Sequence, residues 1–225
     1  MILNKKIVLC GAGGHAKSIY SALKQYAEYE IVGYLDMQKK DFANLKYIGN
    51  DEGVVSLKSK GVDYAFVCVG SVGNPMIRKK LFKNLKDAKY YLPAIIDKTA
   101  SVDAKFIGEN VFVGKNAVVN FDSVIEDMAI INSGAIIEHD AHIEKYVHVA
   151  PGAVVCGNCK IGENTHIGAG SVVIQGVNIG KNCIIGAGSV VVKDIPDGVI
   201  AYGNPCKVVR KNEQSIDNCW GWCKP

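Results

Sequence analysis

Four of the five histidines lie in the second half of the chain, and imidazole is the side chain best suited to general-base work near neutral pH. His139 stands between Glu138 and Asp140. A carboxylate beside a histidine orients the ring and stabilises its protonated form, so we expect His139 to act as a base with one of these acids. A histidine taken singly is more often a solvated polar residue. The other candidates are His142, His148 and His166.

A second group of candidate residues follows the first apolar run of the chain, residues 7–10. The segment 11–15 (Gly-Ala-Gly-Gly-His) separates this run from a helical stretch, so free N–H groups at a helix N-terminus could bind phosphate. Asp36 ends the next predicted strand, where dinucleotide-binding folds place the acid that holds a ribose. Ala16 takes the last glycine position of that fingerprint. The alternative is a turn that only packs helix on strand.

A dinucleotide or a nucleotide sugar could occupy such a glycine-rich turn. NAD-linked dehydrogenases need a longer, two-part nucleotide fold, whereas only about 90 residues precede the repeats described below. The sequence therefore favours a nucleotide sugar.

The eight cysteines predict neither a disulfide framework nor a metal site. Most of them stand singly among apolar residues. Cys156-x-x-Cys159 has the spacing of a metal or redox pair, but Cys159 occupies a small, inward position of the repeat, as Cys183 does. We therefore expect packing roles and no bound metal.

An internal repeat organises the chain from Ile107 onward, because every sixth residue there is Ile or Val. Fifteen positions in succession obey this rule, which excludes chance. Four places after most of them stands a small or β-branched residue, such as Ala117 or Ser123, so both positions must face one narrow core. The aliphatic positions are Ile107, Val113, Val119, Ile125, Ile131, Ile137, Ile143, Val149, Val155, Ile161, Ile167, Val173, Ile179, Ile185 and Val191.

A period of six suits short strands joined by tight corners, with the aliphatic residue inward and the small residue in the turn. Three hexads make one triangular coil of about 18 residues, so the repeat predicts about five coils of a parallel β-helix. His148 and His166 are 18 residues apart and are expected to stack one coil above the other.

The first part of the chain alternates between strand, turn and helix patterns. We expect strands over residues 7–10, 31–35 and 65–69, and helices over 16–29 and 75–85 with Asn74 as candidate N-cap. This order predicts an α/β, Rossmann-like domain with a parallel sheet. The expected organisation is an α/β domain at 1–93, a β-helix at 94–210 and an unclassified tail at 211–225, which holds Cys219, Trp220, Trp222 and Cys223.

Charge and hydropathy exclude several classes of partner. The 225 residues carry a net charge of +4, too mild and dispersed for nucleic acid or an anionic membrane, and 48% hydrophobic residues, too many for disorder. No apolar run reaches the about 18 residues of a membrane helix, and we expect no signal peptide. The composition favours a cytoplasmic protein.

Five features of the sequence occur together in one known family. They are the segment 11–15, the hexads, 132–140 (Asn-Ser-Gly-Ala-Ile-Ile-Glu-His-Asp), 146–149 (Tyr-Val-His-Val) and 202–205 (Tyr-Gly-Asn-Pro). With them the chain resembles a bacterial family of sugar acyltransferases, which contains the UDP-4-amino-sugar N-acetyltransferases of bacillosamine synthesis and the sialic acid O-acetyltransferases. The resemblance spans roughly residues 5–210, and Cys206 departs from it, because Ala commonly follows the Asn-Pro pair.

The resemblance implies a left-handed β-helix, although the general rule for parallel crossovers favours the opposite hand. It also implies a homotrimer with active sites between neighbouring prisms. His139 would be the general base and Asp140, not Glu138, its partner. His148 would lie at the acetyl-CoA thioester and the Gly157 N–H at the acetyl carbonyl.

Further ligand contacts are implied by the same resemblance. The pantetheine and nucleotide of acetyl-CoA are expected along Ala169, Gly186 and Ala187. The sugar nucleotide is expected at Gly13, Gly14, His15, Asp36, Met37, Gly70 and Asn132.

We therefore expect an acetyltransferase that moves an acetyl group from acetyl-CoA to the amino group of a nucleotide-linked sugar, such as a 4-amino-4,6-dideoxy sugar, by direct attack. O-acetylation of a sugar or sialic acid hydroxyl by the same histidine is the alternative within this chemistry. A β-helix that serves only as a scaffold is the alternative of another class.

Overall fold

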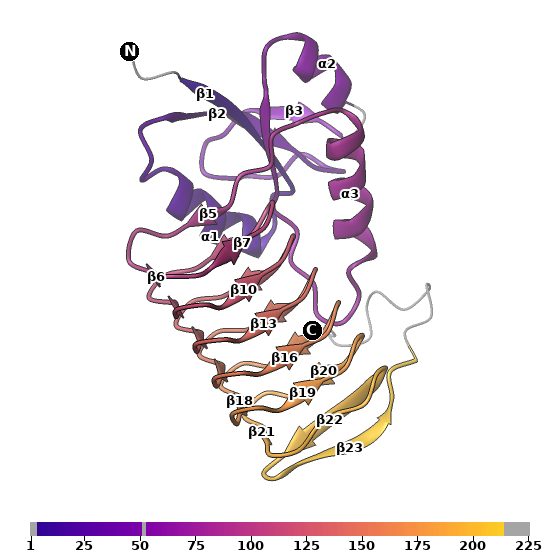
Figure 1. The fold of residues 1–225 in the computed structure, drawn as a ribbon. Coiled ribbons are helices and arrows are strands. Elements are labelled where there is room, and N and C mark those ends of the chain that lie inside the picture. The colour runs from indigo at the N-terminus through magenta and orange to yellow at the C-terminus, as the bar shows by residue number, and fades with distance from the viewer. Residues whose placement is uncertain (1–3, 51–52, 214–225) are drawn as a thin grey trace.

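The computed structural model describes residues 4–50 and 53–213, which form an α/β domain on top of a triangular prism (Figure 1). The elements of the α/β domain are β1 (Lys5–Cys10), α1 (Gly14–Leu23), β2 (Tyr29–Leu35), β3 (Tyr47–Gly49), α2 (Val54–Ser59), β4 (Tyr64–Val67) and α3 (Met76–Asp87). Its sheet has the order β3-β2-β1-β4 and is parallel throughout. The predicted Rossmann-like arrangement is therefore confirmed.

The α/β domain differs from the sequence-based expectations in three details. The helix expected over 16–29 ends at Leu23, because Tyr29 pairs with Lys5 at the start of β2. Pro75, not Asn74, is the N-cap of α3, although Asn74 Oδ1 accepts a hydrogen bond from the Met76 N–H at 3.0 Å. The short elements β3 and α2 were not expected, since neither has a long periodic pattern.

The remaining chain winds around a prism with three faces, each a sheet of mostly two-residue strands (Figure 1). The first face holds β7 (Phe106–Ile107), β10 (Val124–Ile125), β13 (His142–Ile143), β16 (Lys160–Ile161) and β19 (Asn178–Ile179). The second holds β5 (Ile95–Ile96), β8 (Phe112–Val113), β11 (Ile130–Ile131), β14 (His148–Val149), β17 (His166–Ile167), β20 (Ile184–Ile185), β22 (Val199–Gly203) and the antiparallel β23 (Cys206–Lys211). The third holds β6 (Ser101–Val102), β9 (Val118–Val119), β12 (Ile136–Ile137), β15 (Val154–Val155), β18 (Val172–Val173) and β21 (Val190–Val191).

The chain passes from the first face to the second, to the third and back to the first. We name each corner by the two faces that it joins. Residues 18 apart pair between successive coils, as in the series Ile130, His148 and His166. The expected stacking of the two histidines is thus confirmed, with ring centroids 4.8 Å apart.

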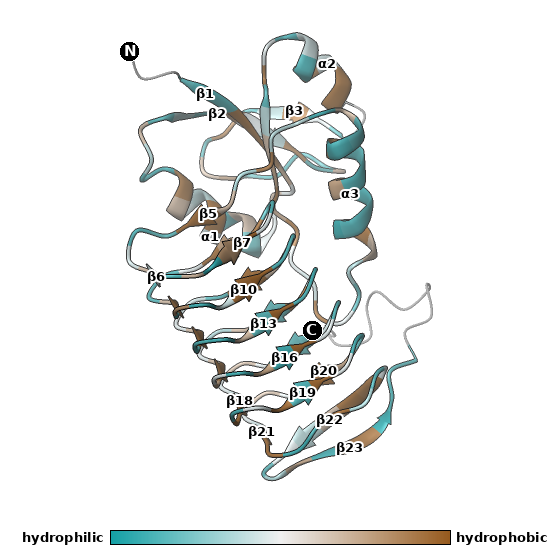
Figure 2. Ribbon diagram, in the orientation of Figure 1, coloured by the Kyte–Doolittle hydropathy of each residue, from teal (hydrophilic) through white to brown (hydrophobic). Residues whose placement is uncertain are grey.

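The aliphatic hexad residues form the core of the prism. Ile137 and Ile161 are fully buried, as are the small residues four places after hexad positions, among them Ala135 and Ser123. The Ser123 hydroxyl donates to the Asn120 carbonyl at 2.6 Å, so this buried polar group is satisfied. Many strands of the coils are brown in the hydropathy colouring (Figure 2). The predicted inward positions are therefore confirmed.

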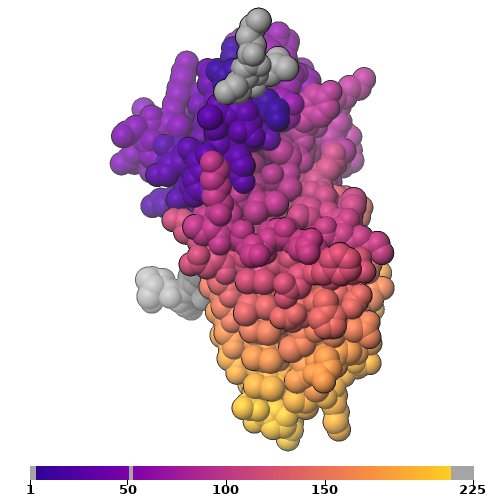
Figure 3. Space-filling view, turned by 60° about the vertical axis from the view of Figure 1, so that its left-hand side comes forward, coloured from indigo at the N-terminus to yellow at the C-terminus, as the bar shows by residue number. Residues whose placement is uncertain are grey.

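The α/β domain rests on the upper part of the second face. Outward-facing Ile95, Phe112 and Ile130 pack with buried residues of α1 in one apolar cluster. The same outward column continues downward with His148 and His166, which lie beyond this apolar contact. In the space-filling view the domain sits directly on the coils (Figure 3). The contact between the α/β domain and the second face is therefore apolar in the first coils, and the two histidines lie in the coils that follow.

The first–second corner supplies polar contacts to the same domain. Asn110 Oδ1 accepts a hydrogen bond from the Val67 N–H at 2.8 Å, and Lys79 Nζ lies 2.7 Å from Glu163 Oε1. These contacts tie β4 and α3 to the coils. No helix within the described ranges is long and apolar enough to cross a bilayer.

A pair of neighbouring residues in β16 tests the energetics of the prism. Ile161→Ala is expected to lower the free energy of unfolding by about 2–5 kcal/mol, because it leaves a cavity in a fully buried core. Lys160→Ala, on the outward and exposed side of the same strand, is the control and is expected to change it by under about 1 kcal/mol. Urea unfolding measures the free energy of unfolding of both variants. Equal losses would contradict the assignment of Ile161 to the inward side and of Lys160 to the outward side of the strand.

Candidate functional site

His139 lies at the third–first corner, between β12 and β13, and is exposed. Its Nδ1 is 2.7 Å from Asp140 Oδ2. Glu138 is engaged elsewhere, since its Oε2 accepts a hydrogen bond from Asn120 Nδ2 at 2.9 Å. An ionised carboxylate only accepts, so the His139 Nδ1–H donates to Asp140 and Nε2 keeps its lone pair. The geometry thus selects Asp140, and not Glu138, as the partner of the ring.

The hydrogen bond to Asp140 raises the pKa of His139 above its usual value. Burial opposes this increase, and the negative charges of Asp140 and Glu138 add to it. An imidazole with a raised pKa and a free Nε2 is a stronger base than an isolated one. The corner therefore carries a group able to accept a proton near neutral pH.

Gly157 lies one coil below His139 at the same corner, because the two positions are 18 residues apart. A Cβ built on Gly157 would lie 2.8 Å from both Nε2 and Cε1 of His139, closer than real Cβ contacts allow. Only glycine leaves room for the ring in this position. The backbone of residue 157 and the basic nitrogen of His139 thus share one small region.

The carboxyl ends of β1, β2 and β4 meet at one edge of the α/β sheet. The glycine-rich segment follows β1, Asp36 follows β2 and Gly70 follows β4, so the predicted sugar-nucleotide residues of this domain gather there. Gly11 has φ +112°, and a Cβ on it would lie 2.9 Å from Val69 Cγ2. The turn therefore requires glycine for its conformation and for close packing.

Asp36 is tied directly to the glycine-rich turn. Its Oδ2 accepts hydrogen bonds from the Ala12 N–H at 2.9 Å and from Lys40 Nζ at 2.8 Å. Burial alone would raise the pKa of Asp36, but these bonds and one from the Gln38 N–H hold it below its usual value. Asp36 is therefore an anion that faces the edge of the sheet, while the neighbouring Met37 is strongly exposed.

The N-terminus of α1 is open to a ligand. Gly13 is the N-cap and provides no side-chain hydrogen bond to the first turn. A Cβ on Gly13 or Gly14 would meet no atom within 4 Å, and both residues are exposed. This arrangement leaves space beside the N–H groups at the positive end of the helix.

His15 of the α/β domain and His148 of the prism both lie at the junction between the two parts. His15 packs edge-on against Phe112, with ring centroids 5.3 Å apart, and a Cβ built on Gly70 would lie 3.3 Å from the His15 Cβ. His148 Nδ1 lies 3.0 Å from the Ser71 carbonyl oxygen. Burial lowers the pKa of His15 to about 3, and the charge of Arg78 adds to this effect.

The tautomer of His148 follows from its two partners. A carbonyl oxygen only accepts, so Nδ1–H donates to Ser71. Asn132 Oδ1 accepts from the Ser133 N–H at 2.8 Å, which turns Asn132 Nδ2 toward His148 Nε2 at 3.1 Å. Burial and the neighbouring His166 lower the pKa of His148 to about 3. His148 is therefore a neutral imidazole, and Asn132 belongs to the same group.

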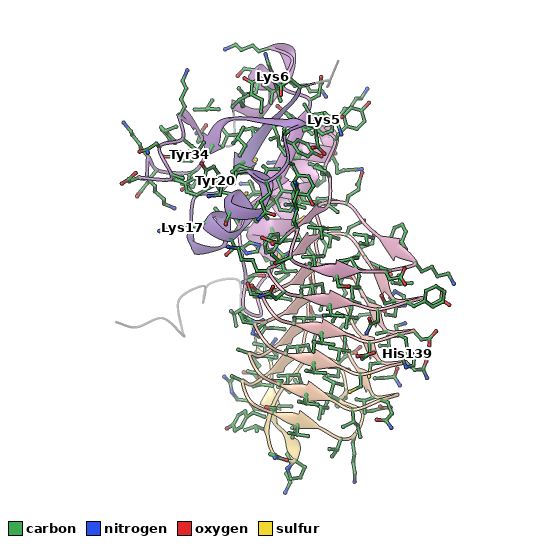
Figure 4. The ribbon with its side chains drawn as sticks, turned by 90° about the vertical axis from the view of Figure 1, so that its left-hand side faces the viewer. Lys5, Lys6, Lys17, Tyr20, Tyr34 and His139 are labelled. Atoms are coloured by element: carbon green, nitrogen blue, oxygen red, sulfur yellow. The ribbon has the colours of Figure 1, made fainter. Side chains whose placement is uncertain are left out.

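The structure divides the predicted site residues between opposite sides of the prism. His148 points outward from the second face, whereas His139 and Gly157 lie at the third–first corner, which is opposite that face. Figure 4 shows His139 on the side away from Lys17, Tyr20 and Tyr34 of the α/β domain. Within one chain, the two histidines therefore lie on opposite sides of the prism.

The remaining acetyl-CoA candidates occupy a third location. Ala169, Gly186 and Ala187 lie at the second–third corner, below β17 and β20. Ala169 and Ala187 stand in successive coils, and the Ala169 carbonyl accepts a hydrogen bond from the Gly188 N–H at 2.8 Å. None of these three residues has a side chain larger than a methyl group at the corner between the second face, which carries His148, and the third face.

Three residues near these groups escaped the sequence interpretation. Lys40 pairs with Asp36, Ser71 contacts His148 and Arg78 lies in the domain junction. None of them belongs to a recognisable motif, and their contacts join segments far apart in sequence, so no local pattern could reveal them.

Of the cysteine pair 156/159, Cys159 is a packing residue and Cys156 is half-buried. Cys159 is almost fully buried and its Sγ lies 3.0 Å from the Ile174 carbonyl oxygen. Among the described residues, no group of three or more His, Cys, Asp or Glu side chains could hold a metal ion. The tail cysteines 219 and 223 and the two tryptophans beside them lie outside the described residues.

Family models match three parts of the chain. The PglD N-terminal domain matches residues 6–85, the hexapeptide repeat of succinyl-transferase residues 106–144, and the bacterial transferase hexapeptide (six repeats) residues 158–193. Among curated proteins, no sequence matches this chain significantly.

Solved structures match nearly the whole chain. Perosamine N-acetyltransferase from Caulobacter crescentus, with one histidine replaced by asparagine and with CoA and GDP-perosamine bound, is 33% identical with a TM-score of 0.85, covering 91% of this chain and 96% of that one. The acetyltransferase domain of PglB from Neisseria gonorrhoeae, bound to acetyl coenzyme A, is 35% identical with a TM-score of 0.83, covering 92% and 100%. WeeI from Acinetobacter baumannii shares the fold at 24% identity, with a TM-score of 0.78 over 90% and 99%.

Proposed function

Because this chain belongs to the bacterial sugar acyltransferase family with a left-handed β-helix, we propose that it transfers an acetyl group from acetyl-CoA to the amino group of a nucleotide-linked amino sugar. The single observation that carries the proposal is the His139–Asp140 pair above Gly157 at an open corner. Complexes of the relatives with CoA, GDP-perosamine and acetyl coenzyme A support the two substrates. A 4-amino-4,6-dideoxy sugar is the acceptor that we propose.

In the proposed mechanism, the sugar amine attacks the thioester carbonyl directly. His139 Nε2 accepts the proton that the amine loses, and Asp140 stabilises the imidazolium. The tetrahedral intermediate then collapses and its C–S bond breaks. The His139 imidazolium gives its proton to the leaving sulfur, so CoA leaves as the thiol and His139 is neutral again. The Gly157 N–H donates to the oxyanion, a preorganised contact that typically contributes a few kcal/mol.

Each substrate has a proposed place. The nucleotide sugar binds at the carboxyl edge of the α/β sheet, with its diphosphate on the N–H groups of Gly13 and Gly14 and its ribose near Asp36. His15, Met37, Gly70 and Asn132 complete that site. Acetyl-CoA binds along Ala169, Gly186 and Ala187, with its acetyl end near His148.

We further propose a homotrimer in which neighbouring prisms share each active site. His139 and His148 face opposite sides of one prism, so both can contact the acetyl group only when the third–first corner of one protomer meets the second face of another. Alignment of two bound substrates between protomers can contribute on the order of 7–11 kcal/mol of the barrier.

Acetyl transfer to a panel of nucleotide sugars tests this function. Purified protein is incubated with acetyl-CoA and either amino or hydroxy sugar nucleotides, and released CoA thiol is measured. We expect release with 4-amino sugars. Release only with hydroxy sugars or sialic acid would replace the proposal by O-acetylation. No release, together with no acetyl-CoA protection against thermal unfolding, would favour a scaffold.

The pH profile tests the role of Asp140. Activity needs neutral His139, so kcat/KM falls as the pH drops through the pKa of this residue. Asp140→Asn removes the interaction that raises that pKa, so the acid limb of the profile is expected to shift to lower pH while kcat falls about tenfold or more. The control is Glu138→Gln, which leaves the Asp140 bond to the ring intact and removes only the weaker effect of the Glu138 charge, so we expect a smaller shift of the acid limb. An unchanged acid limb in Asp140→Asn would contradict this pairing.

A further inference from the structure

Arg78 is a buried cation that the proposed chemistry does not use. It lies in the first turn of α3 and is 2% exposed. A positive charge there faces the positive end of the helix dipole, which is unfavourable. None of the ion pairs between described side chains includes Arg78, so carboxylate pairing does not account for its burial. Burial lowers its pKa to about 10, which leaves it charged at neutral pH.

The guanidinium of Arg78 binds backbone carbonyls instead. Nη2 donates to the Met128 carbonyl, and Nη1 donates to the Tyr146 carbonyl at 3.3 Å. Met128 and Tyr146 are 18 residues apart and occupy equivalent places at the first–second corner of successive coils. Arg78 thus binds two coils at once, a geometry that the fork of a guanidinium allows and a single ammonium does not.

The same guanidinium reaches the partner of His148. Arg78 Nη1 lies 3.3 Å from Ser71 Oγ, and the carbonyl of Ser71 accepts the hydrogen bond from His148 Nδ1 at 3.0 Å. Ser71 lies in the α/β domain, whereas His148 belongs to the prism. Arg78 therefore fixes both sides of the contact that determines the tautomer of His148.

We propose that Arg78 is a positioning residue, which holds the Ser71 carbonyl against His148 and so keeps His148 in its Nδ1-protonated form. Its effect on catalysis rests on the proposed function, whereas its effect on the tautomer does not. The Nε2 atom of His148 then accepts from Asn132, and the imidazole has one fixed orientation beside the sugar-nucleotide edge.

The surroundings of His148 favour its neutral form from every side. Burial contributes most to the lowered pKa of His148. Repulsion from His166 of β17 and His15 of α1 adds to it when those rings are protonated, and Arg78 of α3 adds a permanent positive charge. Asn132 and the Ser71 carbonyl are neutral. Only the hydrogen bond to Ser71 acts in the opposite direction. Loss of Arg78 would remove a positive charge that disfavours protonation of His148, but it would also free the Ser71 carbonyl, whose hydrogen bond favours protonation. These two effects on the pKa oppose each other, so the tautomer of His148 is the informative readout.

The matched control for general docking is Lys79→Ala. Lys79 follows Arg78 in α3 and forms an ion pair with Glu163 across the same junction, without contact to the Ser71–His148 pair. The variants Arg78→Gln and Arg78→Lys are compared with it in the full-length protein. The readouts are ¹⁵N NMR of the histidine rings from pH 4 to 8, which needs no substrate, and kcat and KM for acetyl transfer.

In wild type and in Lys79→Ala, His148 is expected to stay neutral with a protonated Nδ1. In Arg78→Gln, the Nδ1 and Nε2 signals are expected to move toward a mixture of tautomers, with kcat about tenfold lower. Arg78→Lys keeps the charge, and we expect it to fold and to show a partial change even if Arg78→Gln does not fold. Wild-type His148 signals in both Arg78 variants, or an equal change in Lys79→Ala, would overturn the proposal. Altered signals in a protein without acetyl transfer would refute the proposed function alone.

Discussion

His139→Ala is expected to lower kcat about 10²–10⁴-fold while acetyl-CoA still binds, because the substitution removes the base but no contact with the body of the cofactor. The expectation rests on the free Nε2 of His139 and on the Asp140 bond that fixes the ring. Rates are measured by thiol release at saturating substrates, and cofactor binding by the shift in unfolding temperature that acetyl-CoA produces.

The control for His139→Ala is His142→Ala. His142 is the next histidine along the chain, lies on the first face and pairs with Glu126 at 2.8 Å. We expect its removal to change kcat less than about threefold, because His142 is bonded to Glu126 and not to the His139–Asp140 pair. Near-normal kcat in His139→Ala would refute the assignment of the base, and equal losses in both variants would indicate a general structural effect.

Mixing two inactive variants is expected to restore activity. His139→Ala and His148→Asn each damage every active site of a uniform trimer. When the two are unfolded, mixed in equal amounts and refolded together, about a quarter of the sites combine His139 from one protomer with His148 from its neighbour. We therefore expect about a quarter of the wild-type kcat per site, in contrast to the near-zero activity of either variant alone.

A double variant provides the control for complementation. His139→Ala/His148→Asn in one chain, refolded with wild type, offers intact pairs only where two wild-type protomers adjoin, again about a quarter of the sites. The decisive comparison is the mixture of single variants. If its activity stays at the level of the separate variants, one prism supplies both histidines and the shared site is wrong.

The prism was predictable in detail, and the reason is its narrow core. An inward position in a coil with three two-residue strands admits only Ile, Val or a small residue. The residue types at 137 and 135 therefore predict that Ile137 and Ala135 are buried. The same period gave the register between His148 and His166. A pairing of His139 with an adjacent carboxylate was accessible too, because adjacent residues at a corner remain neighbours in space. The choice of Asp140 over Glu138 came from the family resemblance, since both acids adjoin His139 in sequence.

The assembly of the two domains was not predictable from local pattern. Ser71 and His148 are separated by 77 residues, and Arg78 and Met128 by 50. These contacts depend on the direction in which the α/β domain leans against the second face, and side chains at such a junction follow no period. The placement of His139 and His148 on opposite sides of the prism follows from the order of the three faces. The hexads alone do not indicate which face binds which ligand.

The three faces make insertions and deletions unequal in their consequences. An added hexad before residue 139 would preserve every inward Ile or Val, so the core would accept it. All residues after it, however, would move round the prism by one face, and the histidines of the second face would point away from the α/β domain. Only an insertion of a whole coil, about 18 residues, restores their direction. The core of the prism therefore accepts the insertion or deletion of one hexad. The arrangement of the site, in contrast, is kept only when a whole coil is inserted or deleted.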